Sequence, residues 1–211
     1  TQTNSSKTFM KKILITRKLI NSSEILASKL FDVKLNKEDK ILSKEELILE
    51  SEGCNGILSS LTEKFDRDLI IKLPKTIKII SNFAVGFGNI DIIAARKKNI
   101  IVTNTPDVLT DATAEIAMLI LLGAARRAKE GIEWVNKKNW KWSADFLMGK
   151  QLTGSRLGIL GMGRIGRAVA EKARAFGMKI HYYNRSKLDK NLEKEAVYHK
   201  SLESLLSVSD F

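Results

Sequence analysis

Cysteine and proline are scarce in this sequence. Its 211 residues contain one cysteine, Cys54, and two prolines beside thirteen glycines. A single thiol cannot form an intramolecular disulfide, and no spacing typical of a zinc site occurs, so we expect a buried, inert thiol in a reducing cytoplasm. The hydrophobic content of 44% and the lack of a repeat at a fixed period exclude a disordered, low-complexity or solenoid protein.

Long hydrophobic runs are also missing. The most apolar stretch, residues 116–125, has about half of the roughly 20 residues that a membrane-spanning helix requires. No apolar segment with a signal-peptide cleavage site follows the polar residues 1–8. We therefore expect no membrane partner. The chain begins with Thr1, and Met10 directly precedes the first apolar run, so we expect residues 1–9 to be an extra, disordered segment.

Positive charge is in excess, with a formal net charge of +12. Because lysines are scattered along the whole chain, this charge favours a solvated surface, while attraction of anionic cofactors and acidic substrates is an alternative. Nucleic-acid binding would need a basic stripe with aromatic residues or a known binding module. The sequence has only short basic pairs such as Arg126 and Arg127, so we expect no nucleic-acid partner.

Short apolar runs alternate with helical patterns in the first hundred residues. The expected strands are 13–16, 33–35 at a sheet edge, 56–59, 77–80 and 100–102. Four helices are expected. The first begins at Ser22 or Ser23, and the second begins at Ser43 with a capping box to Glu46. The third runs from Thr62 to near Pro74, and the fourth begins at Asn89 or Asp91. Such alternation predicts a parallel sheet with helices on both faces, and we assign residues 1–102 to a first α/β domain.

A long helix follows, beginning at Asp111 or Thr113. Its expected apolar face consists of Ala112, Ile116, Leu119, Leu122, Ala125 and Ala128. Because the middle of this helix is apolar nearly all round, we expect it to be buried between domains or in a dimer. The segment from Trp134 to Trp142 is aromatic and basic, and a loop then leads to Gly149 and to a second α/β unit. We assign residues 103–211 to this second domain.

A glycine-rich turn carries the functional signal. A buried strand, 157–160, runs directly into Gly161-Met162-Gly163-Arg164-Ile165-Gly166, and an alanine-rich helix follows. In this context Gly161 permits a tight turn, Gly163 lets backbone N–H groups approach a pyrophosphate, and Gly166 lets the helix pack on the strand. The helix N-terminus would then stabilise the phosphates electrostatically. A glycine-rich turn without a ligand is the alternative.

The next strand, 179–183, ends in Asn184, Arg185 and Ser186. NAD-specific sites place an acid near this point, where it binds the ribose 2′-hydroxyl. An arginine with a hydroxyl and an amide would instead bind a 2′-phosphate. The sequence therefore predicts a preference for NADP(H) over NAD(H), unless Arg185 is an ordinary surface residue and both cofactors are accepted.

These motifs together resemble the D-isomer-specific 2-hydroxyacid dehydrogenase family over nearly the whole chain. Residues 82–91 resemble the family's substrate loop, 104–115 its domain-crossing segment, and 149–166 its entry into the cofactor fold. The sequence of residues 105–115 and the Asn-Arg-Ser that follows the strand 179–183 look most like those of the glyoxylate/hydroxypyruvate reductase branch. The resemblance implies two Rossmann-like or flavodoxin-like parallel-sheet domains, both incomplete because the C-terminal third is absent.

The resemblance also implies roles for individual residues. The backbone N–H groups of Val85 and Gly86 would hold the carboxylate of a small 2-oxo acid such as glyoxylate or hydroxypyruvate, and an ordinary strand-to-helix turn is the alternative. The expected cofactor-binding residues are Thr113, Gly161, Met162, Gly163, Arg164, Ile165, Gly166, Asn184, Arg185 and Ser186. Thr113 could also cap its helix. Trp140 and Trp142 lie where related reductases place aromatic residues near a partner subunit's active site, but their spacing differs, and packing in the core or an interface is the favoured interpretation. We expect a homodimer through residues 111–142.

The family's catalytic Arg, Glu and His are expected downstream of this sequence. The histidines present are His181, inside an expected strand, and His199, expected to be exposed before a short helix at 202–206. We assign neither to catalysis and expect this chain to be inactive alone, because hydride transfer to a 2-oxo acid needs a proton donor and a cation. A non-catalytic nucleotide-binding or regulatory module is the alternative function.

Overall fold

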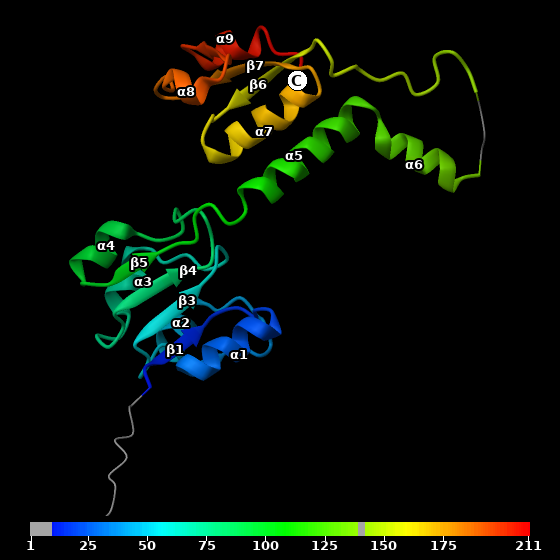
Figure 1. Ribbon diagram of the computed structural model, residues 1–211. Helices are drawn as coiled ribbons and strands as arrows, with labels where there is room; N and C mark the ends of the chain where they lie inside the picture. The colour runs from blue at the N-terminus through cyan, green and yellow to red at the C-terminus, as the bar shows by residue number, and fades with distance from the viewer. Residues whose placement is uncertain (1–9, 139–141) are drawn as a thin grey trace, which may run out of the picture. The chain divides into compact units, whose positions relative to one another are not determined.

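The computed structural model describes residues 10–138 and 142–211. The chain forms two compact units, one up to Pro106 and one from Asp107 onward (Figure 1). Both units are α/β and contain parallel sheets, which confirms the predicted fold class. The expected disorder of residues 1–9 and the role suggested for Trp140 lie outside the described residues.

The first unit contains a five-stranded parallel sheet with the order β2-β1-β3-β4-β5, the flavodoxin-like order. Its elements are β1 (Lys12–Ile15), α1 (Asn21–Leu30), β2 (Asp32–Leu35), α2 (Lys44–Glu50), β3 (Gly56–Ser59), α3 (Arg67–Lys72), β4 (Ile79–Asn82), α4 (Ile92–Lys97) and β5 (Ile101–Thr103). Strand β2 lies at an edge, as predicted. The core is built from the apolar runs of the inner strands, with Leu14, Ile57 and Ile80 almost fully buried.

Two of the expected helix starts in this unit are wrong. The N-cap residue of α1 is Ile20, and the Glu24 carboxylate accepts a hydrogen bond from the Leu19 N–H at 2.9 Å, so Ser22 and Ser23 lie inside the first turn. Helix α3 begins at Arg67 and not at Thr62, because the Asp66 side chain caps it by accepting from the Leu69 N–H at 3.1 Å. The Ser43–Glu46 capping box and the Asp91 N-cap are confirmed.

The second unit contains a three-stranded parallel sheet with the order β6-β7-β8. Its elements are α5 (Thr110–Ala125), α6 (Ala128–Asn136), β6 (Arg156–Leu160), α7 (Arg164–Ala175), β7 (Lys179–Tyr183), α8 (Lys190–Glu193), β8 (Val197–His199) and α9 (Leu202–Leu206). Helix α7 lies along β6 and β7 and packs against α5 (Figure 1). After α9 the chain returns to β6, where the Gly158 N–H donates to the Phe211 carbonyl oxygen at 2.9 Å.

The long helix differs from its prediction in its start and in its buried face. Its N-cap residue is Leu109, whose side chain cannot accept a hydrogen bond, so neither Asp111 nor Thr113 caps it. Its buried residues are Ala114, Met118 and Ala125. Of the face expected from the sequence, Ala112, Ile116, Leu119 and Ala128 are exposed. The reason is that a helix apolar nearly all round has no unique face that a 3.6-residue period could identify. The chain turns at Arg127, with φ at 53°, and continues as α6, which the sequence did not predict.

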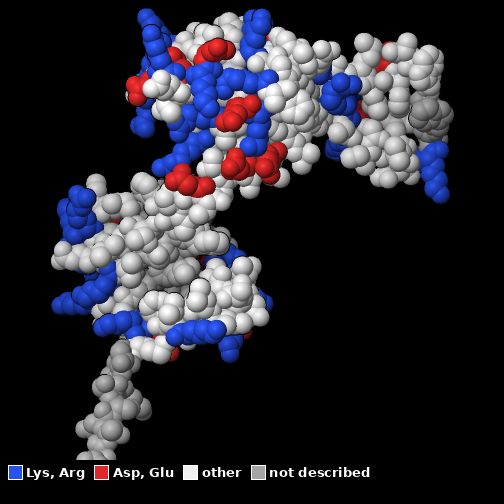
Figure 2. All heavy atoms as spheres, viewed as in Figure 1, with Lys and Arg blue, Asp and Glu red and all other residues white. Residues whose placement is uncertain are grey.

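The surface carries its charge in a dispersed form. Figure 2 shows Lys and Arg spread over one face of the second unit, with Asp and Glu placed among them. This distribution fits the solvated surface favoured by the sequence. Over residues 10–138 and 142–211, no helix combines the length and the apolar character needed to cross a membrane.

Candidate cofactor site and substrate loop

The turn between β6 and α7 requires glycine at two positions. Gly161 has φ at 96°, in the left-handed region that L side chains rarely adopt. At Gly166 a Cβ atom would collide with the Gly161 carbonyl oxygen and lie 3.2 Å from Ile159 Cγ2. The helix therefore packs directly onto the strand, which is the role the sequence predicted for this glycine.

Gly163 is free of such constraints inside the protein. In the described part of the chain, no heavy atom lies within 4 Å of the position its Cβ would take. Gly163 is also the N-cap residue of α7, whose first turn is Arg164, Ile165 and Gly166 and carries no acid. An open backbone at the positive end of a twelve-residue helix suits a phosphate group.

The loop after β7 is tied to this turn. The Asn184 side-chain oxygen accepts a hydrogen bond from the Met162 N–H at 2.7 Å. A cavity of about 620 Å³ lies between the two segments, lined by residues 160–163, 183–189 and Leu192. The structure thus brings Gly161, Met162 and Gly163 together with Asn184, Arg185 and Ser186 around one cavity. The other predicted cofactor residues, Thr113, Arg164, Ile165 and Gly166, do not line it.

The cavity also contains charged residues that sequence reasoning missed. Lys187 and Asp189 line it beside Arg185 and Ser186, and all four are exposed. Lys187 adds a second cation for a phosphate, whereas the carboxylate of Asp189 would oppose one. The signal available was the run Arg185-Ser186-Lys187, which continues directly from the strand ending.

Several predicted cofactor residues have other partners as well. The Met162 side chain is buried in the core at 1% exposure, and its N–H donates to Asn184. Arg164 Nε forms an exposed ion pair with Asp107 Oδ1 at 2.7 Å. Ile165 and Thr113 are half-buried, and the Thr113 N–H donates to the Leu109 carbonyl oxygen at 2.9 Å as an ordinary first-turn hydrogen bond.

A buried tyrosine supports the same loop. Tyr182 on β7 has no exposed surface, and its hydroxyl donates to Glu193 Oε1 at 2.7 Å and accepts from the Leu188 N–H at 3.1 Å. Burial, together with the hydrogen bond to Glu193, raises the pKa of Tyr182 to about 12. The hydroxyl therefore stays protonated and can donate throughout the physiological pH range.

The predicted substrate loop, in the first unit, is held by asparagine side chains. Asn104 Nδ2 donates to the Val85 carbonyl oxygen at 2.7 Å, and Asn82 Nδ2 donates to the Gly86 carbonyl oxygen at 2.9 Å. Asn82 is itself buried and accepts from Ser59 Oγ at 3.1 Å. Within residues 10–138 and 142–211, the N–H groups of Val85 and Gly86 have no hydrogen-bond acceptor. Both amides are thus available to an anion.

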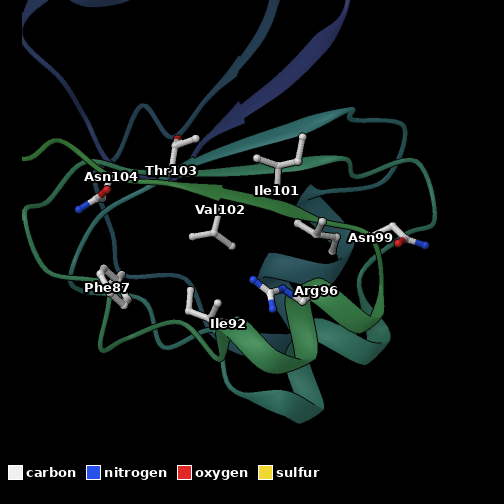
Figure 3. Close-up of a pocket in the computed structure, with 9 residues that line it drawn as sticks. Phe87, Ile92, Arg96, Asn99, Ile101, Val102, Thr103 and Asn104 are labelled. Carbon is white, nitrogen blue, oxygen red and sulfur yellow. The ribbon is translucent and has the colours of Figure 1, made fainter.

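A second cavity, of about 580 Å³, lies beside this loop between α4 and β5. Phe87, Ile92 and Val102 point into it from the loop, the helix and the strand (Figure 3). Asn104 lines its end, whereas Val85 and Gly86 do not line it. The cavity is therefore separate from the two amides.

The two histidines contact each other in the second unit. His181 Nδ1 and His199 Nε2 are 2.9 Å apart, and His199 Nδ1 is 3.2 Å from Ser204 Oγ. His199 is half-buried in β8, so its expected exposure was wrong, because the strand β8 was not predicted. Burial first, and then the charge of His199, lowers the pKa of His181. The short helix expected at 202–206 is confirmed as α9.

Comparisons with known proteins agree with this geometry. Residues 118–211 match the NAD binding domain of D-isomer specific 2-hydroxyacid dehydrogenases. A glyoxylate reductase of Thermococcus litoralis is 39% identical over 205 residues, which cover 95% of this chain and 62% of that protein. A glycerate dehydrogenase of Hyphomicrobium methylovorum is 40% identical over 204 residues, which cover 95% and 63%.

Solved structures give the same result. The crystal structure of a protein from Polaromonas sp. JS6 66, assigned to the D-isomer specific 2-hydroxyacid dehydrogenases, is 42% identical with a TM-score of 0.87 and coverages of 95% and 63%. The chain therefore spans less than two thirds of the length of these relatives. On its glycine turn, its parallel sheets and these similarities, the chain belongs to the D-isomer-specific 2-hydroxyacid dehydrogenase family.

Proposed function

We propose that this protein reduces a small 2-oxo acid, such as glyoxylate or hydroxypyruvate, to the 2-hydroxy acid by hydride transfer from NAD(P)H. The observation that carries the proposal is the hydrogen bond between Met162 N–H and Asn184, which joins the glycine turn to the loop after β7 around one cavity. The names of the relatives, glyoxylate reductase and glycerate dehydrogenase, support the same substrate class.

The two units would bind different ligands, the first the substrate and the second the cofactor. In this proposal the first unit is the substrate domain, and the N–H groups of Val85 and Gly86 bind the substrate carboxylate. The second unit is the cofactor domain, and the backbone at 161–166 with the N-terminus of α7 binds the pyrophosphate. The nicotinamide cofactor supplies the hydride. Thr113, Arg164 and Ile165 stay predicted contacts along the cofactor.

The cofactor preference follows from the charge at the cavity. Arg185, Ser186 and Lys187 offer two cations and a hydroxyl to a 2′-phosphate, while Asp189 is the one acid among the described residues that line the cavity. We therefore propose NADPH as the preferred cofactor, with NADH as a weaker ligand.

Binding calorimetry of the chain with NADPH and NADH tests the site. We expect NADPH to bind at least tenfold more tightly, and Arg185→Ala to remove most of that difference. Lys190→Ala is the matched control, because Lys190 is exposed on α8 and does not line the cavity. Tighter binding of NADH would overturn the preference, and no binding of either would overturn the site.

Turnover separates catalysis from mere binding. In a protein extended to the length of its relatives, oxidation of NADPH on addition of glyoxylate or hydroxypyruvate is the expected result. Nucleotide binding without turnover of either acid would favour a non-catalytic nucleotide-binding module.

We also propose a homodimer through residues 111–142. Helices α5 and α6 expose large apolar side chains, and Trp142 is 78% exposed. The exposed residues are Ile116, Leu119, Ile120, Ile132 and Val135. An apolar surface of this kind is typical of protein–protein interfaces. We also propose a cytoplasmic location. Cys54 is a free, buried thiol, and the cytoplasm keeps thiols reduced.

A further inference from the structure

The loop that lines the cofactor cavity is fixed at both ends. At its start, Asn184 accepts from the Met162 N–H at 2.7 Å, and its carbonyl oxygen accepts from the Tyr198 hydroxyl at 3.4 Å. At its end, the Leu188 N–H donates to the Tyr182 hydroxyl at 3.1 Å. Arg185 and Ser186 lie between these two anchors and are exposed.

The anchor at Leu188 extends to the following helix. The Tyr182 hydroxyl donates to Glu193 Oε1 at 2.7 Å, and Glu193 is the last residue of α8. The same oxygen of Glu193 lies 3.6 Å from Lys187 Nζ, on the loop itself. One buried hydroxyl thus connects β7, the loop and α8.

We propose that Tyr182 is a positioning residue for cofactor binding, whose buried hydroxyl holds Leu188 and Glu193 so that Arg185, Ser186 and Lys187 face the adenosine ribose of the dinucleotide. The inference rests on the proposed cofactor function of this cavity. It assigns to the hydroxyl a role distinct from that of the ring, which packs against the Tyr198 ring at a centroid distance of 5.3 Å.

Tyr182→Phe separates the two roles, because it keeps the ring and removes only the hydroxyl. The variant leaves the Leu188 N–H and the partly buried Glu193 carboxylate without this partner. A hydrogen bond of this kind corresponds to a change in affinity of about three- to tenfold. We expect the Kd for NADPH to rise by that factor.

Binding of inorganic pyrophosphate distinguishes a positioning role from a merely structural one. A general loss of structure would weaken the binding of pyrophosphate as well as that of NADPH. In the proposed site pyrophosphate would contact the glycine turn and α7 but not the loop, so its inhibition constant, measured by displacement of bound NADPH, should change less than twofold in Tyr182→Phe. Amide hydrogen exchange adds a direct probe. The Leu188 amide should exchange faster, while the amides of β6 keep their protection.

A second pair of variants covers the case in which Tyr182→Phe does not fold. Glu193→Gln keeps an oxygen acceptor for the hydroxyl, whereas Glu193→Leu removes it. We expect Glu193→Gln to bind NADPH nearly as tightly as the unchanged protein and Glu193→Leu to bind it several-fold more weakly.

The outcomes separate this inference from the proposed function. Weaker NADPH binding with unchanged pyrophosphate inhibition supports the positioning role. NADPH affinity within twofold of the unchanged protein, or an equal loss for both ligands, overturns it and leaves the cofactor site intact. If the unchanged protein binds no dinucleotide, the proposed function fails, and the positioning role fails with it.

Discussion

The side-chain amide of Asn104 donates a hydrogen bond of 2.7 Å to the carbonyl oxygen of Val85, which lies 19 residues earlier in the chain. Asn82 holds the Gly86 carbonyl oxygen in the same way at 2.9 Å. Because both carbonyl oxygens are bound on the protein side, the loop can present its amides to an anion without rearranging. In the proposed function, the asparagine side chains would therefore act on the substrate indirectly, through the backbone.

Replacing Asn104 by Leu should weaken substrate binding without affecting the cofactor. The variant loses the donor to Val85 and leaves that carbonyl oxygen free to rotate. In a protein extended to the length of its relatives, we expect the KM for glyoxylate to rise about tenfold, the effect of losing one hydrogen bond that orients the site, with the KM for NADPH unchanged. Steady-state kinetics measure both values. Asn21→Ser, on an exposed helix position of the same unit, is the control, and an equal effect there would refute the positioning role of Asn104.

The glycine turn offers a contrast between folding and binding. Gly161 at φ 96° cannot accept a side chain without strain, so Gly161→Ala should lower the free energy of unfolding by about 1–2 kcal/mol. Gly163 has open space around its Cβ position, so Gly163→Ala should leave the stability nearly unchanged. The added methyl group would instead stand where the pyrophosphate approaches, and we expect NADPH affinity to fall at least tenfold.

Urea unfolding and binding calorimetry on the same two variants check this contrast. Unchanged NADPH affinity in Gly163→Ala would mean that the open space is not the phosphate site. A Gly161→Ala protein as stable as the unchanged chain would mean that the turn can adopt another backbone conformation.

The histidine pair predicts a pH dependence of stability. Burial and the charge of His199 lower the folded-state pKa of His181 below its usual value, with Arg156 and Lys179 acting in the same direction and Asp210 opposing them. The unfolded chain therefore binds the proton more readily than the folded chain. The stability is fully present above the unfolded pKa, about 6.5, and declines as the pH falls below it.

Urea unfolding between pH 8 and pH 5 measures this decline. His199→Gln removes one of the two charges that would repel each other, so its unfolding free energy should depend less steeply on pH over this range. Parallel curves for the two proteins would show that the pair does not control acid stability.

Features encoded by neighbouring residues could be predicted from the sequence, whereas features set by tertiary packing could not. The parallel strands other than β8 and the glycine turn were predictable, because β6 and its turn are encoded by neighbouring residues with strong backbone preferences. The buried face of α5 was not, because an all-round apolar helix leaves the choice between Met118 and Ile116 to tertiary packing. The hydroxyl of Tyr182 and the amides of Asn82 and Asn104 were also missed. Their partners lie 4 to 23 residues away in hydrogen bonds that no periodic pattern encodes.

The exposed face of α5 gives the last prediction, which concerns assembly. Ile120 is 64% exposed within the proposed interface, so Ile120→Lys would place a charge in an apolar contact. We expect sedimentation equilibrium to show a dimer for the unchanged protein and a monomer for Ile120→Lys at micromolar concentration. Ile20→Lys is the matched control, because Ile20 is 73% exposed but lies in the first unit, outside residues 111–142. If both lysine variants dissociate equally, the interface is not on α5, and a monomeric unchanged protein would overturn the homodimer proposal.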